Sequence, residues 1–78
     1  MKDFSQVIYA TGSQVLTSEM TWLKVNPFEE IREDILVKEW SLFLVLGSRK
    51  NFKEEIEYEV IDARLRRGWI SSKFLILT

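Results

Sequence analysis

The chain has 78 residues, with 11 basic and 12 acidic side chains and a formal net charge of −1. It contains neither histidine nor cysteine, which excludes Ser-His and Cys-His catalytic pairs, disulfides and nearly all zinc sites. Apolar residues make up 46% of the chain, enough for one domain with a core of its own. We therefore expect a single domain over residues 1–78 that is not an enzyme and has no cofactor.

The first third of the chain predicts strands. Residues 6–10 are β-branched and aromatic, and a turn-forming run follows at 11–13. Residues 15–25 place valine, leucine and tryptophan between threonines, which favours a strand over a helix. Because large aromatics dominate burial in small domains, we expect Trp22 in the core.

Pro27 ends the preceding element, since proline has no N–H for a ladder hydrogen bond. The residues that follow predict one helical turn near 27–32. Asn26 would cap this turn, and the early glutamates would complement its dipole.

From residue 34 the strand signals are stronger. Residues 34–38 and 42–47 predict two strands with a tight connection at 39–41 between them. The second strand is apolar on both faces and is expected at the centre of the sheet. A polar loop is expected over residues 48–53.

The cleanest two-residue period of the chain lies in residues 56–60. Ile56, Tyr58 and Val60 are expected on the core face, and Glu57 and Glu59 in solvent. The apolar residue at position 61 breaks this period and indicates a bulge or a turn at 62–64.

The end of the chain predicts a strand at 68–70, a one-turn helix near 71–73 and a final apolar strand over 74–77. Five to seven short antiparallel strands with almost no helix indicate an all-β protein, either a small barrel or a pair of orthogonal sheets.

Residues 34–77 resemble the Src-homology-3-like (SH3-like) barrel, particularly its bacterial branch. The end of that fold reads Gly-Trp-aliphatic, a serine-rich turn, an aromatic and an aliphatic, and this chain has Gly68, Trp69, Ile70, Ser71, Ser72, Phe74 and Leu75 in those places. The stretch is also similar to small barrel proteins of tailed bacteriophages, including cyanophages. The resemblance implies an SH3-like barrel over residues 34–78, with residues 1–33 as an N-terminal strand extension and loop, and it implies a viral origin.

Two acidic clusters, at residues 29–34 and 54–59, have the residue types for acid–base chemistry or a magnesium site. Acids that alternate along a strand normally form a solvated face that protects an edge from aggregation. We therefore predict neither catalytic residues nor a metal site.

The predicted function is protein binding by a non-catalytic accessory or structural phage protein, with a host or virion protein as partner. The predicted contact residues are Trp69, Trp40, Tyr58, Arg64, Arg66, Arg67 and Lys73. One alternative is a nucleic-acid-binding barrel that uses the Arg64–Arg67 turn and Lys73. Another is a self-associating subunit that pairs edge strands through residues 74–77 or the N-terminal strand.

The longest apolar run, residues 42–46, is far shorter than the roughly 20 residues of a membrane-spanning helix. An acid stands at position 3, where a secretory signal would be apolar. We therefore expect a soluble protein of the cytoplasm, the host cytoplasm if it is viral, with no membrane contact.

Overall fold

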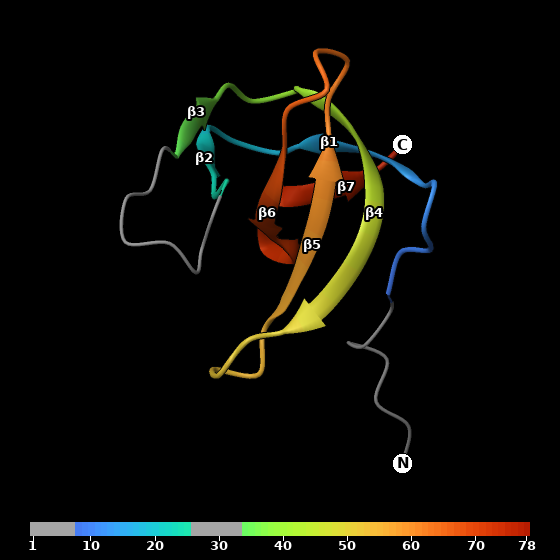
Figure 1. The fold of residues 1–78 in the computed structure, drawn as a ribbon, viewed down its shortest axis with the longest axis vertical. Coiled ribbons are helices and arrows are strands. Elements are labelled where there is room, and N and C mark those ends of the chain that lie inside the picture. The colour runs from blue at the N-terminus through green and yellow to red at the C-terminus, as the bar shows by residue number, and fades with distance from the viewer. Residues whose placement is uncertain (1–7, 26–33) are drawn as a thin grey trace.

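The structure is a computed structural model, and it describes residues 8–25 and 34–78. Over these residues the fold is all-β, as predicted, with short antiparallel strands and one 3₁₀ turn (Figure 1). The one-turn helix predicted near 27–32 lies outside the described residues. The elements are β1 (Gln14–Thr17), β2 (Thr21–Leu23), β3 (Ile35–Val37), β4 (Leu42–Lys50), β5 (Ile56–Ile61), β6 (Arg67–Ser71), η1 (Ser72–Phe74) and β7 (Leu75–Leu77).

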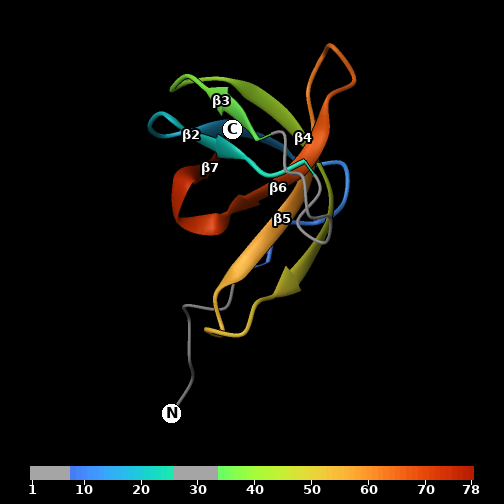
Figure 2. The ribbon, with the colours of Figure 1, turned by 60° about the vertical axis from the view of Figure 1, so that its left-hand side comes forward.

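The strands form two antiparallel sheets. The larger sheet has the order β6-β5-β4-β1-β7, and β2 pairs with β3 in a smaller one. Figure 2 brings the smaller sheet to the front of the view, against the larger one. The prediction that residues 42–47 form the central strand is confirmed, because β4 is the middle strand of the five.

The two sheets meet where the end of β2 crosses β6. The Lys24 N–H donates to the Trp69 carbonyl at 3.1 Å, and the Trp69 N–H donates to the Lys24 carbonyl at 3.0 Å. A Cβ atom at Gly68 would lie 2.7 Å from the Lys24 carbonyl oxygen, closer than two such atoms can approach. Glycine at position 68 therefore permits the contact that fixes Lys24 on the large sheet.

The core lies on one face of the large sheet and is covered by the small one. Side chains that alternate along the strands point to this face, and Tyr58 and Val60 are buried there as predicted. The opposite face is less covered: in β4, buried Phe43 alternates with exposed Leu42. The full core is Val15, Leu23, Val37, Phe43, Val45, Tyr58, Val60, Ile70 and Leu75.

Three predictions for the N-terminal region need correction. The strand expected over 15–25 is two strands, because the chain bends at Ser18 and Glu19. Trp22 is not in the core: it is 53% exposed, since Leu23 occupies the inward position of β2 and the alternation places Trp22 outward. Residues 8–10 are not in a strand, and residues 6–7 lie outside the described residues.

The hairpin of β4 and β5 also differs from the prediction. β4 continues to Lys50 through residues that were expected in a loop. A register shift lies in β4, between Val45 and Gly47, and after Ile61 the chain makes the turn that was one of the two predicted alternatives. Glu57, expected in solvent, is only 5% exposed. The reason is that basic side chains from other segments cover the outer face of β5 at this point, as described next.

Candidate functional site: a cationic groove at one end of the sheet

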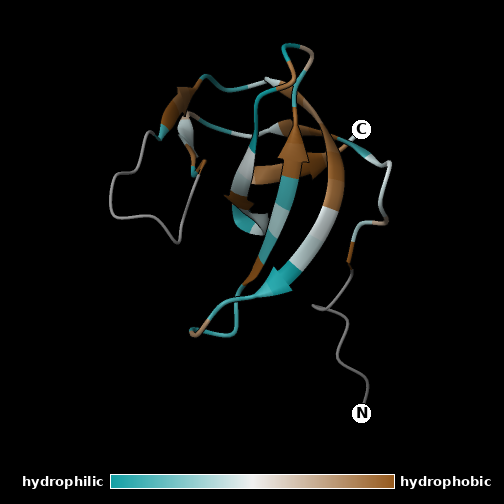
Figure 3. Cartoon of the chain, in the orientation of Figure 1, coloured by the Kyte–Doolittle hydropathy of each residue, from teal (hydrophilic) through white to brown (hydrophobic). Residues whose placement is uncertain are grey.

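A groove of about 570 Å³ opens where β4 passes into β5. Its lining contains five basic and two acidic residues, a formal excess of three positive charges in a chain whose net charge is −1. Figure 3 shows the same region as the hydrophilic end of the β4–β5 hairpin, opposite the apolar half of the sheet. The lining residues are Lys24, Arg49, Lys50, Asn51, Phe52, Lys53, Glu55, Glu57, Ser71, Lys73 and Phe74.

Asn51 shapes the loop that forms one wall of the groove. Its Oδ1 accepts hydrogen bonds from the backbone N–H groups of Lys53 at 2.9 Å and Glu55 at 3.0 Å. The loop turns sharply at Glu54, which has a φ of +62°. Asparagine favours such turns because its short side chain replaces a backbone acceptor. The loop is therefore a defined turn that holds its lysines at the groove.

Glu57 lies at the inner end of the groove and joins three segments of the chain. Its Oε1 accepts from the Arg49 Nε at 2.9 Å, and the Arg49 Nη2 lies 2.9 Å from the same oxygen. The Lys24 Nζ is 3.6 Å from its Oε2. The guanidinium of Arg49 stacks 4.1 Å from the centre of the Trp69 ring, a cation–π contact that holds it flat against β6.

These contacts set the ionisation of Glu57. Burial alone would raise the pKa of its carboxyl group, but hydrogen bonds from Arg49 and Asn51 and the charges of Lys24 and Arg49 outweigh it. The pKa of Glu57 is therefore lowered from its ordinary value of 4.5. At neutral pH the group is a carboxylate enclosed by cations.

The outer part of the groove combines lysines with phenylalanines. Phe52 is 93% exposed, and the ammonium of Lys53 lies 5.9 Å from the centre of its ring. Lys73 lies 5.4 Å from the Phe74 ring and 3.8 Å from a carboxylate oxygen of Glu55. Phe74 is partly buried against the core, whereas cations beside an exposed ring such as that of Phe52 can bind a ligand that carries both negative charge and apolar surface.

Two of the predicted contact residues lie at or near this groove. Lys73 lines it, and Trp69 supports the lining residue Arg49 from below. Tyr58 does not reach the surface: it is 1% exposed, stacks on Tyr9 and accepts the Tyr9 backbone N–H at its hydroxyl oxygen. Its ring fills the core and is not available to a partner.

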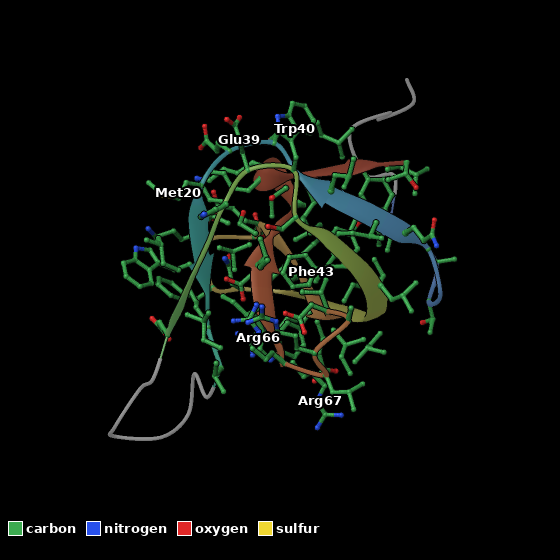
Figure 4. All side chains as sticks on the ribbon, turned by 90° about the horizontal axis from the view of Figure 1, so that it is seen from above. Met20, Glu39, Trp40, Phe43, Arg66 and Arg67 are labelled. Atoms are coloured by element: carbon green, nitrogen blue, oxygen red, sulfur yellow. The ribbon has the colours of Figure 1, made fainter. Side chains whose placement is uncertain are left out.

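The remaining predicted residues lie away from the groove. Trp40 is 60% exposed in the turn between β3 and β4, and Arg64, Arg66 and Arg67 belong to the turn between β5 and β6 and to the first residue of β6. Figure 1 places the β5–β6 turn at the opposite end of the hairpin from the β4–β5 loop. Figure 4 shows Trp40 on one side of that end and Arg66 and Arg67 on the other, with Phe43 between them.

Arg66 and Arg67 are already engaged by acids of the same hairpin. The Arg66 Nε lies 2.7 Å from the Asp62 Oδ2, and the Arg67 Nε lies 3.5 Å from the Glu59 Oε2. A depression of about 430 Å³ beside the turn includes Arg64 and Arg66 in its lining. It holds fewer cations than the groove, and its one aromatic residue, Phe43, is buried.

The sequence prediction missed most of the groove. Lys24, Arg49, Lys50 and Lys53 were part of regions assigned to a strand end or a polar loop, and Glu57 was assigned to solvent. One signal was present: Arg49 and Glu57 are of opposite charge and pair directly across β4 and β5. A hairpin drawn with its turn at 51–55 would have found this pair.

Other kinds of site find little support within residues 8–25 and 34–78. This part of the chain contains no group of three or more carboxylates that could hold a metal ion. Nor does it contain a helix long and apolar enough to cross a membrane. In comparisons with known proteins, no family model, no curated protein and no solved structure matches this chain.

Proposed function

We propose that this chain is a non-catalytic binding domain that takes a short acidic segment of a protein partner into the groove between the β4–β5 loop and η1. The observation that carries the proposal is the gathering of five cations and two phenylalanines around one cavity in a chain of slightly negative net charge. Folding places like charges together at a cost, and an acidic ligand offsets that cost.

The chemistry of the groove favours a segment with carboxylates next to an apolar side chain. Lys50 and Lys53 have no carboxylate within ion-pair distance among the residues that the structure describes. Phe52 presents nearly its whole ring to solvent beside them. Carboxylates of the partner would pair with the lysines, and an apolar side chain would cover the ring.

An acidic protein segment fits this chain better than a nucleic acid. The groove holds five of the eleven basic residues and two of the twelve acidic ones, so the rest of the chain has six basic and ten acidic residues. Among the residues outside the groove that the structure describes, four are basic and six are acidic, so an extended polyanion would meet no further excess of positive charge beyond the groove. A short segment would need the groove alone.

The finer predictions from the sequence remain predictions, and this proposal does not depend on them. They are membership of the SH3-like family, an origin in a tailed bacteriophage, and a cytoplasmic place of action. The Arg64–Arg67 turn stays as the second candidate binding region, with nucleic acid as its ligand. The proposed experiment compares the two regions directly.

The test is fluorescence anisotropy with a labelled ten-residue peptide that alternates aspartate or glutamate with leucine. Its controls are the same peptide with asparagine and glutamine in place of the acids and a single-stranded oligonucleotide of ten bases. The protein is used as wild type, as Lys50→Glu/Lys53→Glu and as the matched reversal Arg64→Glu/Arg67→Glu.

We expect the acidic peptide to bind the wild type and the amide peptide to bind at least ten-fold more weakly. Charge reversal in the groove should abolish binding, and reversal at the turn should change it less than two-fold. Preference for the oligonucleotide, or loss of binding only in the Arg64→Glu/Arg67→Glu protein, would overturn the proposal and favour the turn. No peptide binding up to millimolar protein would also overturn it.

A further inference from the structure

The inner half of the groove already contains a carboxylate that belongs to the protein. Glu57 contacts Arg49 through one oxygen and Lys24 through the other, and it is 5% exposed. Asn51 adds a longer contact, with its Nδ2 3.5 Å from the Glu57 Oε2. The inner cations thus have the arrangement of an anion site whose occupant is fixed to the chain.

The outer cations, Lys73, Lys50 and Lys53, are less completely paired with carboxylates. Among the described residues, Lys73 has one partner within ion-pair distance, Glu55 at 3.8 Å, with both side chains well exposed, and exposed pairs of this kind contribute little. Among the described residues, Lys50 and Lys53 have no such partner. The groove is therefore divided into an inner pair of cations that share one carboxylate and an outer set with weaker or no ion pairs.

We propose that Glu57 determines the specificity of the groove, because it occupies Arg49 and Lys24 and leaves the outer lysines alone to bind the acidic groups of the ligand. The proposal rests on the function proposed above and adds a limit to it. A ligand gains from carboxylates that reach Lys50 and Lys53, and it gains little from one that reaches further inward, where Glu57 repels it.

The decisive variant is Glu57→Gln. Glutamine has nearly the same shape and keeps an oxygen that accepts from Arg49, but it has no negative charge. The variant should bind the acidic peptide about three- to ten-fold more tightly near physiological salt, because one negative charge that repels the ligand is removed. It should also unfold more easily, because the charge-assisted hydrogen bonds of the wild type are lost.

Opposite changes in affinity and stability separate this role from a purely structural one, since damage to the groove would lower both. The matched control is Glu59→Gln, on the same strand and with the same change in net charge. Glu59 does not line the groove and pairs with Arg67 at 3.5 Å. Its substitution should change the affinity less than two-fold.

A second comparison uses the wild-type carboxylate and does not require Glu57→Gln to fold. Lys24→Gln should weaken binding less than Lys50→Gln does, because Glu57 already pairs with Lys24. Lys50→Gln should weaken binding at least three-fold. Equal losses from the two substitutions would overturn the inference.

The outcomes distinguish this inference from the proposed function. If the wild type does not bind the acidic peptide, the proposed function fails. If the wild type binds the peptide and Glu57→Gln binds it equally or more weakly, the role proposed for Glu57 is overturned and the proposed function stands. Tighter binding by Glu57→Gln, with little change in Glu59→Gln, supports both.

Discussion

The two hairpin loops of this protein have the same backbone design and opposite chemistry. In each, the first residue accepts through its side-chain Oδ1 from the backbone N–H groups two and four positions later: Asn51 in the β4–β5 loop and Asp62 in the β5–β6 loop. The fourth residue of each loop has a positive φ, +62° at Glu54 and +64° at Leu65. The two loops therefore differ in the chemistry of their side chains and not in the shape of their turns.

The difference lies in the capping side chain. Asp62 is charged, and its second oxygen takes the guanidinium of Arg66 at 2.7 Å. Asn51 is neutral, and its amide group faces the carboxylates of Glu55 and Glu57 instead. The β5–β6 loop therefore pairs Arg66 with its own capping acid, whereas the β4–β5 loop has no charged cap to pair with its lysines.

The largest effect is expected at Gly68, where the small sheet is held against β6. In Gly68→Ala the new Cβ would clash with the Lys24 carbonyl and the Leu23 side chain, so we expect a loss of about 2–3 kcal/mol in the free energy of unfolding. Gly47→Ala is the control, because nothing lies within 4 Å of its Cβ position, and it should change stability by less than about 0.5 kcal/mol. Urea unfolding of the two variants measures both; equal losses would contradict the close approach.

Truncation of the charged cap is the next largest effect. Asp62→Ala removes the acceptor of two backbone N–H groups and of the Arg66 guanidinium, and we expect it to cost about 1–2 kcal/mol. Affinity for the acidic peptide should stay within two-fold, because the groove is at the other end of the hairpin. A large loss of affinity with stability intact would show that the β5–β6 turn takes part in binding.

Acid should remove the stability that Glu57 contributes at the groove and that Asp62 contributes at the β5–β6 loop, in neighbouring pH ranges. Burial raises the pKa of Asp62, but hydrogen bonds from Arg66 and Arg64 and the Arg66 charge outweigh it and lower the pKa from its ordinary 3.8, as the groove cations lower that of Glu57 from 4.5. Groups with a lowered folded pKa stabilise the fold fully above the ordinary value, and the contribution is lost as the pH falls through the folded pKa. The melting temperature of the wild type, measured between pH 7 and pH 2, should therefore decrease once the pH is below about 4.5. It should decrease less steeply in Glu57→Gln and in Asp62→Asn. Slopes equal to that of the wild type in both variants would contradict this.

Exchange of the two caps gives a smaller and more specific effect. Asn51→Asp keeps the Oδ1 acceptor but places a negative charge at the groove, next to Glu55 and Glu57. It should weaken binding of the acidic peptide about three- to ten-fold. Asp62→Asn should leave the affinity within two-fold. The same anisotropy assay measures both, and equal affinities for the two proteins would remove the distinction between the loops.

The contrast between the loops also explains which features could be predicted from the sequence. A turn after Ile61 was one of the two predicted alternatives because Ile61 breaks the two-residue period of the strand, which is a local signal. The strands at 35–37, 56–61 and 67–71 follow from alternation and β-branched residues. Each of these features is determined by residues that are close together in the chain.

The groove could not be predicted from the sequence, because it is formed by contacts between residues that are far apart in the chain. The burial of Glu57 depends on Arg49 across the hairpin and on Lys24, which lies 33 positions earlier and is fixed by the gap at Gly68. Trp22 was assigned to the core because of its size, but alternation in β2 gave the inward position to Leu23. Acidic residues in a strand usually face solvent, and Glu57 departs from that rule only because three segments meet around it.

We propose above all that the groove at the β4–β5 loop binds the acidic peptide and that the β5–β6 loop does not. Two-dimensional ¹H–¹⁵N NMR of the labelled protein, titrated with the acidic peptide, tests it for every amide at once. We predict that the largest shift changes occur in residues 49–55 and 71–74, with residues 62–66 unchanged. Changes concentrated in residues 62–66, or around Trp22 and Trp40, would contradict it.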